Sequence, residues 1–145
     1  MTLRLGYLLL ALLWIQPILA WSSLPEQVPM RFGWDGEPTA FAHRATVWIL
    51  PVLGSILFAI LEGLARVPHI HNYGKRLTPE NKDRLYAASS RLLREVNVAD
   101  TLVFHIVVYS VVTPTFTLPA WPFVFFLLVA YGIPILRVMR RDNFK

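Results

Sequence analysis

The sequence predicts an all-α membrane protein with four transmembrane helices, and two observations lead to this fold class. Hydrophobic residues make up 55% of the 145 residues and charged residues only 16%, whereas an average soluble domain is about 25% charged. The apolar residues also stand in long blocks, and a helix needs ~20 such residues to cross a bilayer. We therefore expect one membrane domain over residues 1–145.

The apolar blocks divide into four expected spans. These spans are residues 5–21, 45–65, 98–113 and 118–139. The last two come from one stretch, residues 101–136, that contains no Asp, Glu, Lys or Arg and is too long for a single span. Pro114, Pro119 and Pro122 lie in its middle, where a helix should end and restart.

The basic residues predict how the spans are oriented. The N-terminal end, the segment 66–97 and the C-terminal tail carry 12 of the 14 Lys and Arg residues, and the loop 22–44 carries the other two. This bias predicts a multi-pass protein of the cell (plasma) membrane with cytoplasmic N- and C-termini. The net charge of +5 then reflects topology and anionic lipid, and it requires no nucleic-acid partner.

A cleaved signal peptide is the alternative for the first span. Arg4 would form its basic region and residues 8–13 its apolar region, with cleavage after Ala20. Ile18 fits poorly the small residue that such a site needs two positions earlier. Cleavage would leave the other three spans unchanged.

The outer loop 22–44 carries the first candidate site. Its stretch 24–39 contains three prolines and two glycines, which exclude a helix and favour a compact turn structure. Residues 34–37 predict a tight turn with Gly36 at positive φ. Phe32 and Trp34 either pack the loop onto the membrane or form a recognition surface. The candidate ligand-binding residues are Phe32, Trp34, Asp35, Gly36 and Glu37.

This loop resembles the signature of the family called domain of unknown function 1648, in which a similar loop joins two spans. The matching residues are Leu24, Pro25, Val28, Pro29, Phe32, Gly36, Glu37 and Pro38. Arg31 and Thr39 stand where the family has a histidine and an acidic residue, so any metal or proton function of that pair would not carry over. The resemblance implies a small bacterial membrane protein.

The segment 68–81 is similar to a second stretch of that family, with Gly74 in place of a proline. The family also includes a larger immunity protein against a secreted sporulation-delay toxin, which implies binding or signalling. Thr78 and Pro79 form a helix start, and neither Gly nor Pro follows until Pro114. We therefore expect one helix over residues 79–113, half of it in the cytoplasm.

Polar side chains within the spans form the second candidate site, because ionisable groups at membrane depth are costly. Glu62 has Arg66 one turn later, so an i,i+4 ion pair explains it without a function. Thr101, His105 and Tyr109 share one helix face. They predict either hydrogen bonds to a neighbouring helix or a polar path.

The remaining residues indicate no catalytic or metal-binding chemistry. The chain lacks cysteine, His69 and His71 lack a third ligand for zinc, and no catalytic motif occurs. We expect no enzyme activity, cofactor or metal. The expected function is a binding, signalling or immunity-type accessory protein that uses loop 24–39 to bind an extracellular peptide or protein. The alternative is a small transporter or permeation unit with a polar face on the third span, which would form a homo-oligomer.

Overall fold

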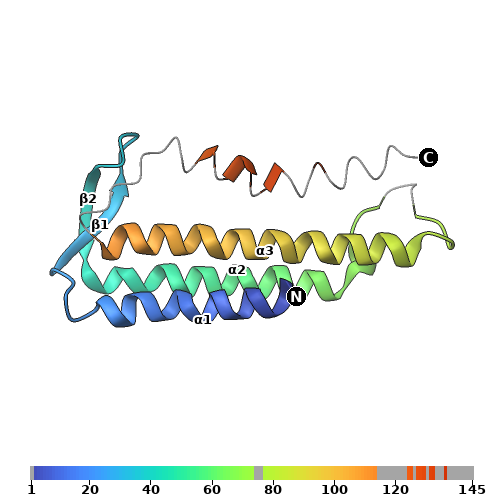
Figure 1. Cartoon of the computed structure of the whole chain (residues 1–145), viewed down its shortest axis with the longest axis horizontal. Coiled ribbons are helices and arrows are strands. Elements are labelled where there is room, and N and C mark those ends of the chain that lie inside the picture. The colour runs from blue at the N-terminus through green and yellow to red at the C-terminus, as the bar shows by residue number, and fades with distance from the viewer. Residues whose placement is uncertain are drawn as a thin grey trace.

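Three long helices run side by side, and a two-stranded hairpin stands across one end of them (Figure 1). The computed structural model describes residues 2–73 and 77–113, together with residues 124, 125, 127–129, 131, 132 and 136. The elements are α1 (Thr2–Ala20), β1 (Gln27–Phe32), β2 (Pro38–His43), the 3-10 turn η1 (Arg44–Trp48), α2 (Ile49–Arg66), the 3-10 turn η2 (Pro68–Ile70) and α3 (Lys82–Val112).

Three helical stretches of the described residues are long and apolar enough to cross a membrane. They are α1, η1 with α2, and α3. The first two follow the predicted spans 5–21 and 45–65, and α3 contains nearly all of the predicted span 98–113 but begins well before it, at Lys82. Much of their apolar surface is exposed on the outside of the bundle, as lipid-facing surface should be. The fourth predicted span, residues 118–139, lies mostly outside the described residues.

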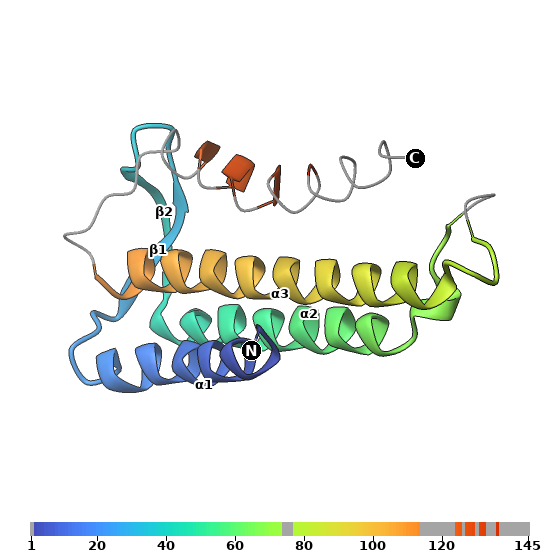
Figure 2. The same cartoon turned by 45° about the vertical axis from the view of Figure 1, so that its right-hand side comes forward.

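Helix α3 is unbroken over 31 residues, which corresponds to about 46 Å at 1.5 Å per residue. A hydrocarbon core is ~30 Å thick, so part of α3 projects beyond it, and Figure 2 shows α3 extending past the start of α1. The expected long helix is therefore confirmed.

The predicted start of this helix is wrong by three residues. The helix begins at Lys82, and the backbone N–H groups of Asn81 and Lys82 donate to the carbonyl of Thr78 at 3.2 and 3.0 Å. The Asn81 side chain in turn accepts from the Thr78 N–H at 2.9 Å. These bonds close a turn over residues 78–82 directly before the regular part of α3.

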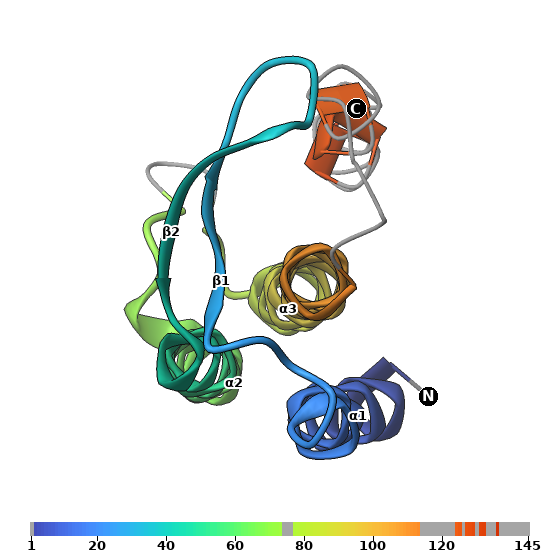
Figure 3. The same cartoon turned by 90° about the vertical axis from the view of Figure 1, so that its left-hand side faces the viewer.

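Helix α3 packs along both α1 and α2, and the three helices form a triangle when seen end-on (Figure 3). Two glycines set how closely they approach. A Cβ on Gly54 would lie 2.9 Å from Cδ2 of Leu13, and a Cβ on Gly6 would lie 3.0 Å from Cε2 of Phe58. The contact at Gly54 is too short for a Cβ, and the contact at Gly6 is tighter than most real Cβ contacts. Each glycine therefore leaves space that a neighbouring side chain occupies.

The hairpin pairs β1 with β2 in antiparallel register, with register shifts between Pro29 and Arg31 and between Arg31 and Phe32. At its tip Gly36 has a φ of 86°, and the Gly33 N–H donates to the Glu37 carbonyl at 2.8 Å. The Glu37 N–H donates to Oδ1 of Asp35 at 3.0 Å. The predicted compact turn with positive φ at Gly36 is thus confirmed, and the strands on either side of it were not expected.

Candidate functional site

The predicted binding residues of the hairpin differ in how exposed they are. Phe32 packs against a buried cluster formed by Leu24, Val28, Val47 and Val111. Gly36 is also buried, whereas Trp34 is 85% exposed, and Asp35 and Glu37 are exposed beside it. Phe32 and Gly36 therefore support the turn, and the other three residues present side chains outward.

Two further apolar side chains, Met30 and Phe41, are exposed on the strands. We call Met30, Trp34, Asp35, Glu37 and Phe41 the hairpin surface. Strand β2 alternates between partly buried and exposed residues, with Phe41 among the exposed ones. Because side chains on a strand alternate between its two faces, a predicted strand here would have indicated that Phe41 is exposed. The loop was expected to contain no strands.

The hairpin is held firmly against the ends of the helices. Val28 of β1 is fully buried in the same cluster as Val111 of α3, and the Arg44 N–H donates to the Glu26 carbonyl at 2.8 Å. The guanidinium of Arg44 also lies 4.9 Å from the ring centre of Trp21. The hairpin surface is therefore displayed on a fixed support.

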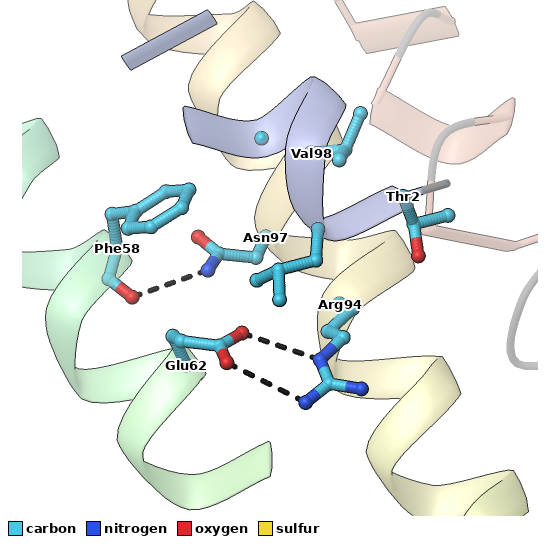
Figure 4. A pocket seen from close by; sticks show the side chains of 8 residues that line it. Thr2, Phe58, Glu62, Arg94, Asn97 and Val98 are labelled. Carbon is cyan, nitrogen blue, oxygen red and sulfur yellow. Dashed lines mark hydrogen bonds and ion pairs between the residues drawn. The ribbon is translucent and has the colours of Figure 1, made fainter. Parts of the chain in front are cut away.

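At the opposite end of the bundle, Glu62 joins all three helices. Its side chain is only 5% exposed and accepts from Nε of Arg66 at 3.0 Å. Arg94 of α3 donates from Nε at 3.3 Å and from Nη2 at 3.5 Å (Figure 4). Arg66 also donates to the hydroxyl of Tyr7 on α1 at 3.1 Å. The expected i,i+4 pair is present, and Arg94 adds a partner 32 residues away that spacing could not reveal.

Asn97 lies one turn along α3 from Arg94 and is 3% exposed. Its Nδ2 donates to the carbonyl of Phe58 at 3.1 Å, while Oδ1 has no partner among the described residues. Because a carbonyl can only accept, this bond fixes the orientation of the amide. The unpaired oxygen is therefore Oδ1. The amino-acid sequence alone did not indicate a role for Asn97.

His105 connects α3 to α1 through both ring nitrogens. Nε2 lies 2.9 Å from the carbonyl of Leu9, and Nδ1 lies 3.0 Å from Oε1 of Gln16. Since the Leu9 carbonyl accepts, Nε2 carries a proton. Thr101 donates to the carbonyl of Asn97 at 2.8 Å, whereas Tyr109 is exposed. At His105 the structure thus shows the interhelical hydrogen bonding that was one of the two expectations.

His71, in the segment after α2, contacts both α2 and α3. Nε2 of His71 lies 3.0 Å from the carbonyl of Leu64, and Nδ1 lies 2.5 Å from Oγ of Ser89. These contacts tie the connecting segment to both helices. Within the described parts of the chain, no three His, Cys, Asp or Glu side chains gather closely enough to hold a metal ion.

The fold and these sites define a small helical protein with membrane-spanning helices and an anchored hairpin. Residues 8–54 match the family model described as domain of unknown function (DUF1648), so the resemblance to this family is confirmed over α1, the hairpin and the start of α2. No solved structure matches the chain.

A relative in the archaeon Archaeoglobus fulgidus, described as an uncharacterized protein, is 49% identical over 59 residues. The match covers 41% of this chain and 32% of the relative, so the chain corresponds to about a third of that protein. Because the relative is archaeal, the comparison does not support the expected restriction to bacteria.

Proposed function

We propose that this chain is a binding protein of the plasma membrane that presents the hairpin surface to an extracellular peptide or protein. The observation that carries the proposal is the 85% exposure of Trp34 on a turn that is fixed by hydrogen bonds and anchored by a buried core. Large exposed apolar groups rimmed by polar residues often mark interaction sites, and tryptophan is enriched among the residues that dominate binding energy.

The composition of the hairpin surface indicates the kind of ligand. Trp34 and Phe41 offer apolar contact, and Asp35 and Glu37 add two exposed carboxylates on the same turn as Trp34. Complementarity then favours a ligand that presents an apolar side chain next to a basic group. A rigid hairpin loses little conformational entropy on binding, which improves the affinity that a small surface can reach.

The same core offers a route for a signal. Val28 of the hairpin and Val111 of α3 belong to one buried cluster, and α3 continues past the start of α1 at the far end of the bundle (Figure 2). A ligand that shifts the hairpin would therefore act directly on α3. The contact between the hairpin and α3 supports a signalling or immunity-type role. The transporter alternative has less support, because Glu62, Thr101 and His105 all form hydrogen bonds within the bundle.

Photo-crosslinking in cells tests the proposal, with a photoreactive residue at position 34 and a matched control at Leu8. Leu8 is also an exposed apolar residue, but it lies on the membrane-spanning α1. We expect a discrete peptide or protein adduct at position 34 and lipid adducts at position 8. Lipid adducts alone at both positions would show that the hairpin rests on the bilayer, and the binding proposal would then fail.

A further inference from the structure

Strand β2 forms an open edge of the hairpin. The hairpin is a sheet of two strands, so each strand has one edge that is not paired with the other. Figure 3 shows β1 between β2 and α3, and β1 contacts α3. The second edge of β1 therefore faces the bundle, whereas the second edge of β2 faces away from it.

The register of the hairpin identifies the backbone groups on this open edge. The Arg44 N–H donates to the Glu26 carbonyl at 2.8 Å, and the same register continues until Phe41 lies opposite Pro29. Bonded and non-bonded pairs alternate along an antiparallel ladder. Arg44 is at a bonded position, so Phe41 and His43, which lie an odd number of residues away, direct their N–H and carbonyl groups to the open edge. Pro29 agrees with this assignment, because proline has no N–H to donate across the pair.

These edge groups are available to another strand. In the described parts of the chain, neither the N–H nor the carbonyl of Phe41 has another partner, and the His43 carbonyl accepts from Oγ1 of Thr46 at 2.9 Å. The N–H of His43 is the third group on the edge. Strand β2 also contains no Lys, Arg, Asp or Glu, and charged residues are a common protection of strand edges against pairing. An extended peptide satisfies such groups, because its own backbone offers donors and acceptors at the spacing of a strand.

We propose that the ligand of the hairpin surface binds as an extended peptide segment that adds a third strand to β2. This mode of binding rests on the proposed function and specifies how the ligand is held. The backbone of the segment pairs with the N–H and carbonyl of Phe41 and with the N–H of His43. A peptide bound in this way gains affinity from main-chain hydrogen bonds and specificity from alternate side chains.

The side chains beside the edge indicate which peptide fits. The Phe41 side chain is 58% exposed and contacts an apolar residue of the segment. Asp35 and Glu37 lie at the turn, where β2 begins, whereas Arg31 is on β1 and Arg44 follows the end of β2. Opposite charges on neighbouring strands stabilise their pairing, so a basic residue of the segment lies next to Glu37. Because Phe41 and Glu37 are four residues apart, the apolar and basic residues of the segment are also about four positions apart.

Two substitutions at one position test the backbone contact. Phe41→Ala removes the ring and keeps the N–H, whereas Phe41→Pro removes both. Edge strands accept proline where its nitrogen faces away from the pair, so the hairpin is kept, and thermal unfolding of each purified variant checks this. The readout is the yield, below saturation, of the adduct formed in cells by a photoreactive residue at position 34. We expect about tenfold less adduct for Phe41→Pro than for Phe41→Ala, because one lost hydrogen bond that leaves a carbonyl of the ligand unpaired is sufficient for that factor.

Crosslinking along the edge tests the pairing without a proline variant. Photoreactive residues replace Phe41 and His43 in separate proteins, and Gln27, which pairs with His43 from β1, is the matched control position. We expect adducts from positions 41 and 43 on ligand residues that are two apart, since the residues of a strand that face one way recur every second position. Position 27 should give little adduct, because β2 separates it from the added strand.

Three results would overturn the proposal. These are equal adduct yields for Phe41→Pro and Phe41→Ala, crosslinks from positions 41 and 43 to ligand residues without the spacing of two, and equal adducts from positions 27 and 43. The last result indicates a folded protein that lies on the face of the sheet. In each case the adduct at position 34 still supports the hairpin as a binding surface, whereas the absence of any peptide or protein adduct at position 34 overturns both the binding function and the added strand.

Discussion

Replacing Gly54 by Ala should destabilise the helix bundle, and the structure allows the size of the effect to be worked out. The added Cβ would lie 2.9 Å from Cδ2 of Leu13 and 3.3 Å from Cγ of Phe104. Leu13 is fully buried, so it has little room to move away. Overpacking of this kind costs about 1–3 kcal/mol.

Gly63→Ala provides the matched control on the same helix. A Cβ there would meet nothing within 4 Å, so only the helix propensity changes, and alanine is favoured over glycine by roughly 0.5–1 kcal/mol. Both substitutions gain this term. The difference in unfolding free energy between the two variants therefore isolates the steric cost at Gly54, which we expect to be about 1–3 kcal/mol.

The measurement is unfolding of the purified protein by sodium dodecyl sulphate in mixed micelles, followed by tryptophan fluorescence. Trp14 lies one residue from Leu13 and donates from Nε1 to Oγ of Ser55 at 3.0 Å, so its emission reports on this contact. Gly63→Ala should unfold at a higher detergent fraction than the unsubstituted protein, and Gly54→Ala at a lower one than Gly63→Ala. Equal midpoints for the two variants would refute the close packing of α1, α2 and α3 at Gly54.

The remaining predictions concern charge, the hairpin and pH. Glu62→Gln should lower the unfolding free energy by about 1–3 kcal/mol in the same assay, because it removes the negative charge and replaces one of the two acceptor oxygens shared by two arginines with an NH2 donor; an unchanged midpoint would contradict this. Trp34→Ala should change stability by less than about 0.5 kcal/mol, whereas Phe32→Ala should cost about 2 kcal/mol, and equal effects would show that the two side chains are not differently buried. A hydrogen bond from its own backbone N–H, followed by one from the side chain of Thr78, lowers the pKa of Glu80 below its usual 4.5. Since the folded-state pKa is the lower one, this contribution is present above pH 4.5 and is lost as the pH falls through the folded-state pKa. The protection factors of the amides at the start of α3, which correct for the intrinsic pH dependence of exchange, should therefore fall in acid, and Thr78→Val should move that fall to higher pH.

Local patterns in the sequence were sufficient to predict the spans and the turn. The length and composition of an apolar block determine whether a helix can cross a membrane, and α1, α2 and α3 follow those blocks. A glycine in a polar tight turn indicates positive φ without knowledge of the fold, and Gly36 has it. These features depend on residues that are close in sequence.

Other features were decided only when distant segments met. Arg94 reaches Glu62 across 32 residues, and His105 reaches Leu9 across 96. The sequence could not distinguish Phe32 from Trp34, two aromatic residues of one loop. The structure packs Phe32, partly buried, against the hairpin core and exposes Trp34. Burial and long-range pairing depend on how closely the helices approach one another. At Gly54 the side chains of Leu13 and Phe104 fill the space where a Cβ would lie, and no local pattern in the sequence indicates these neighbours.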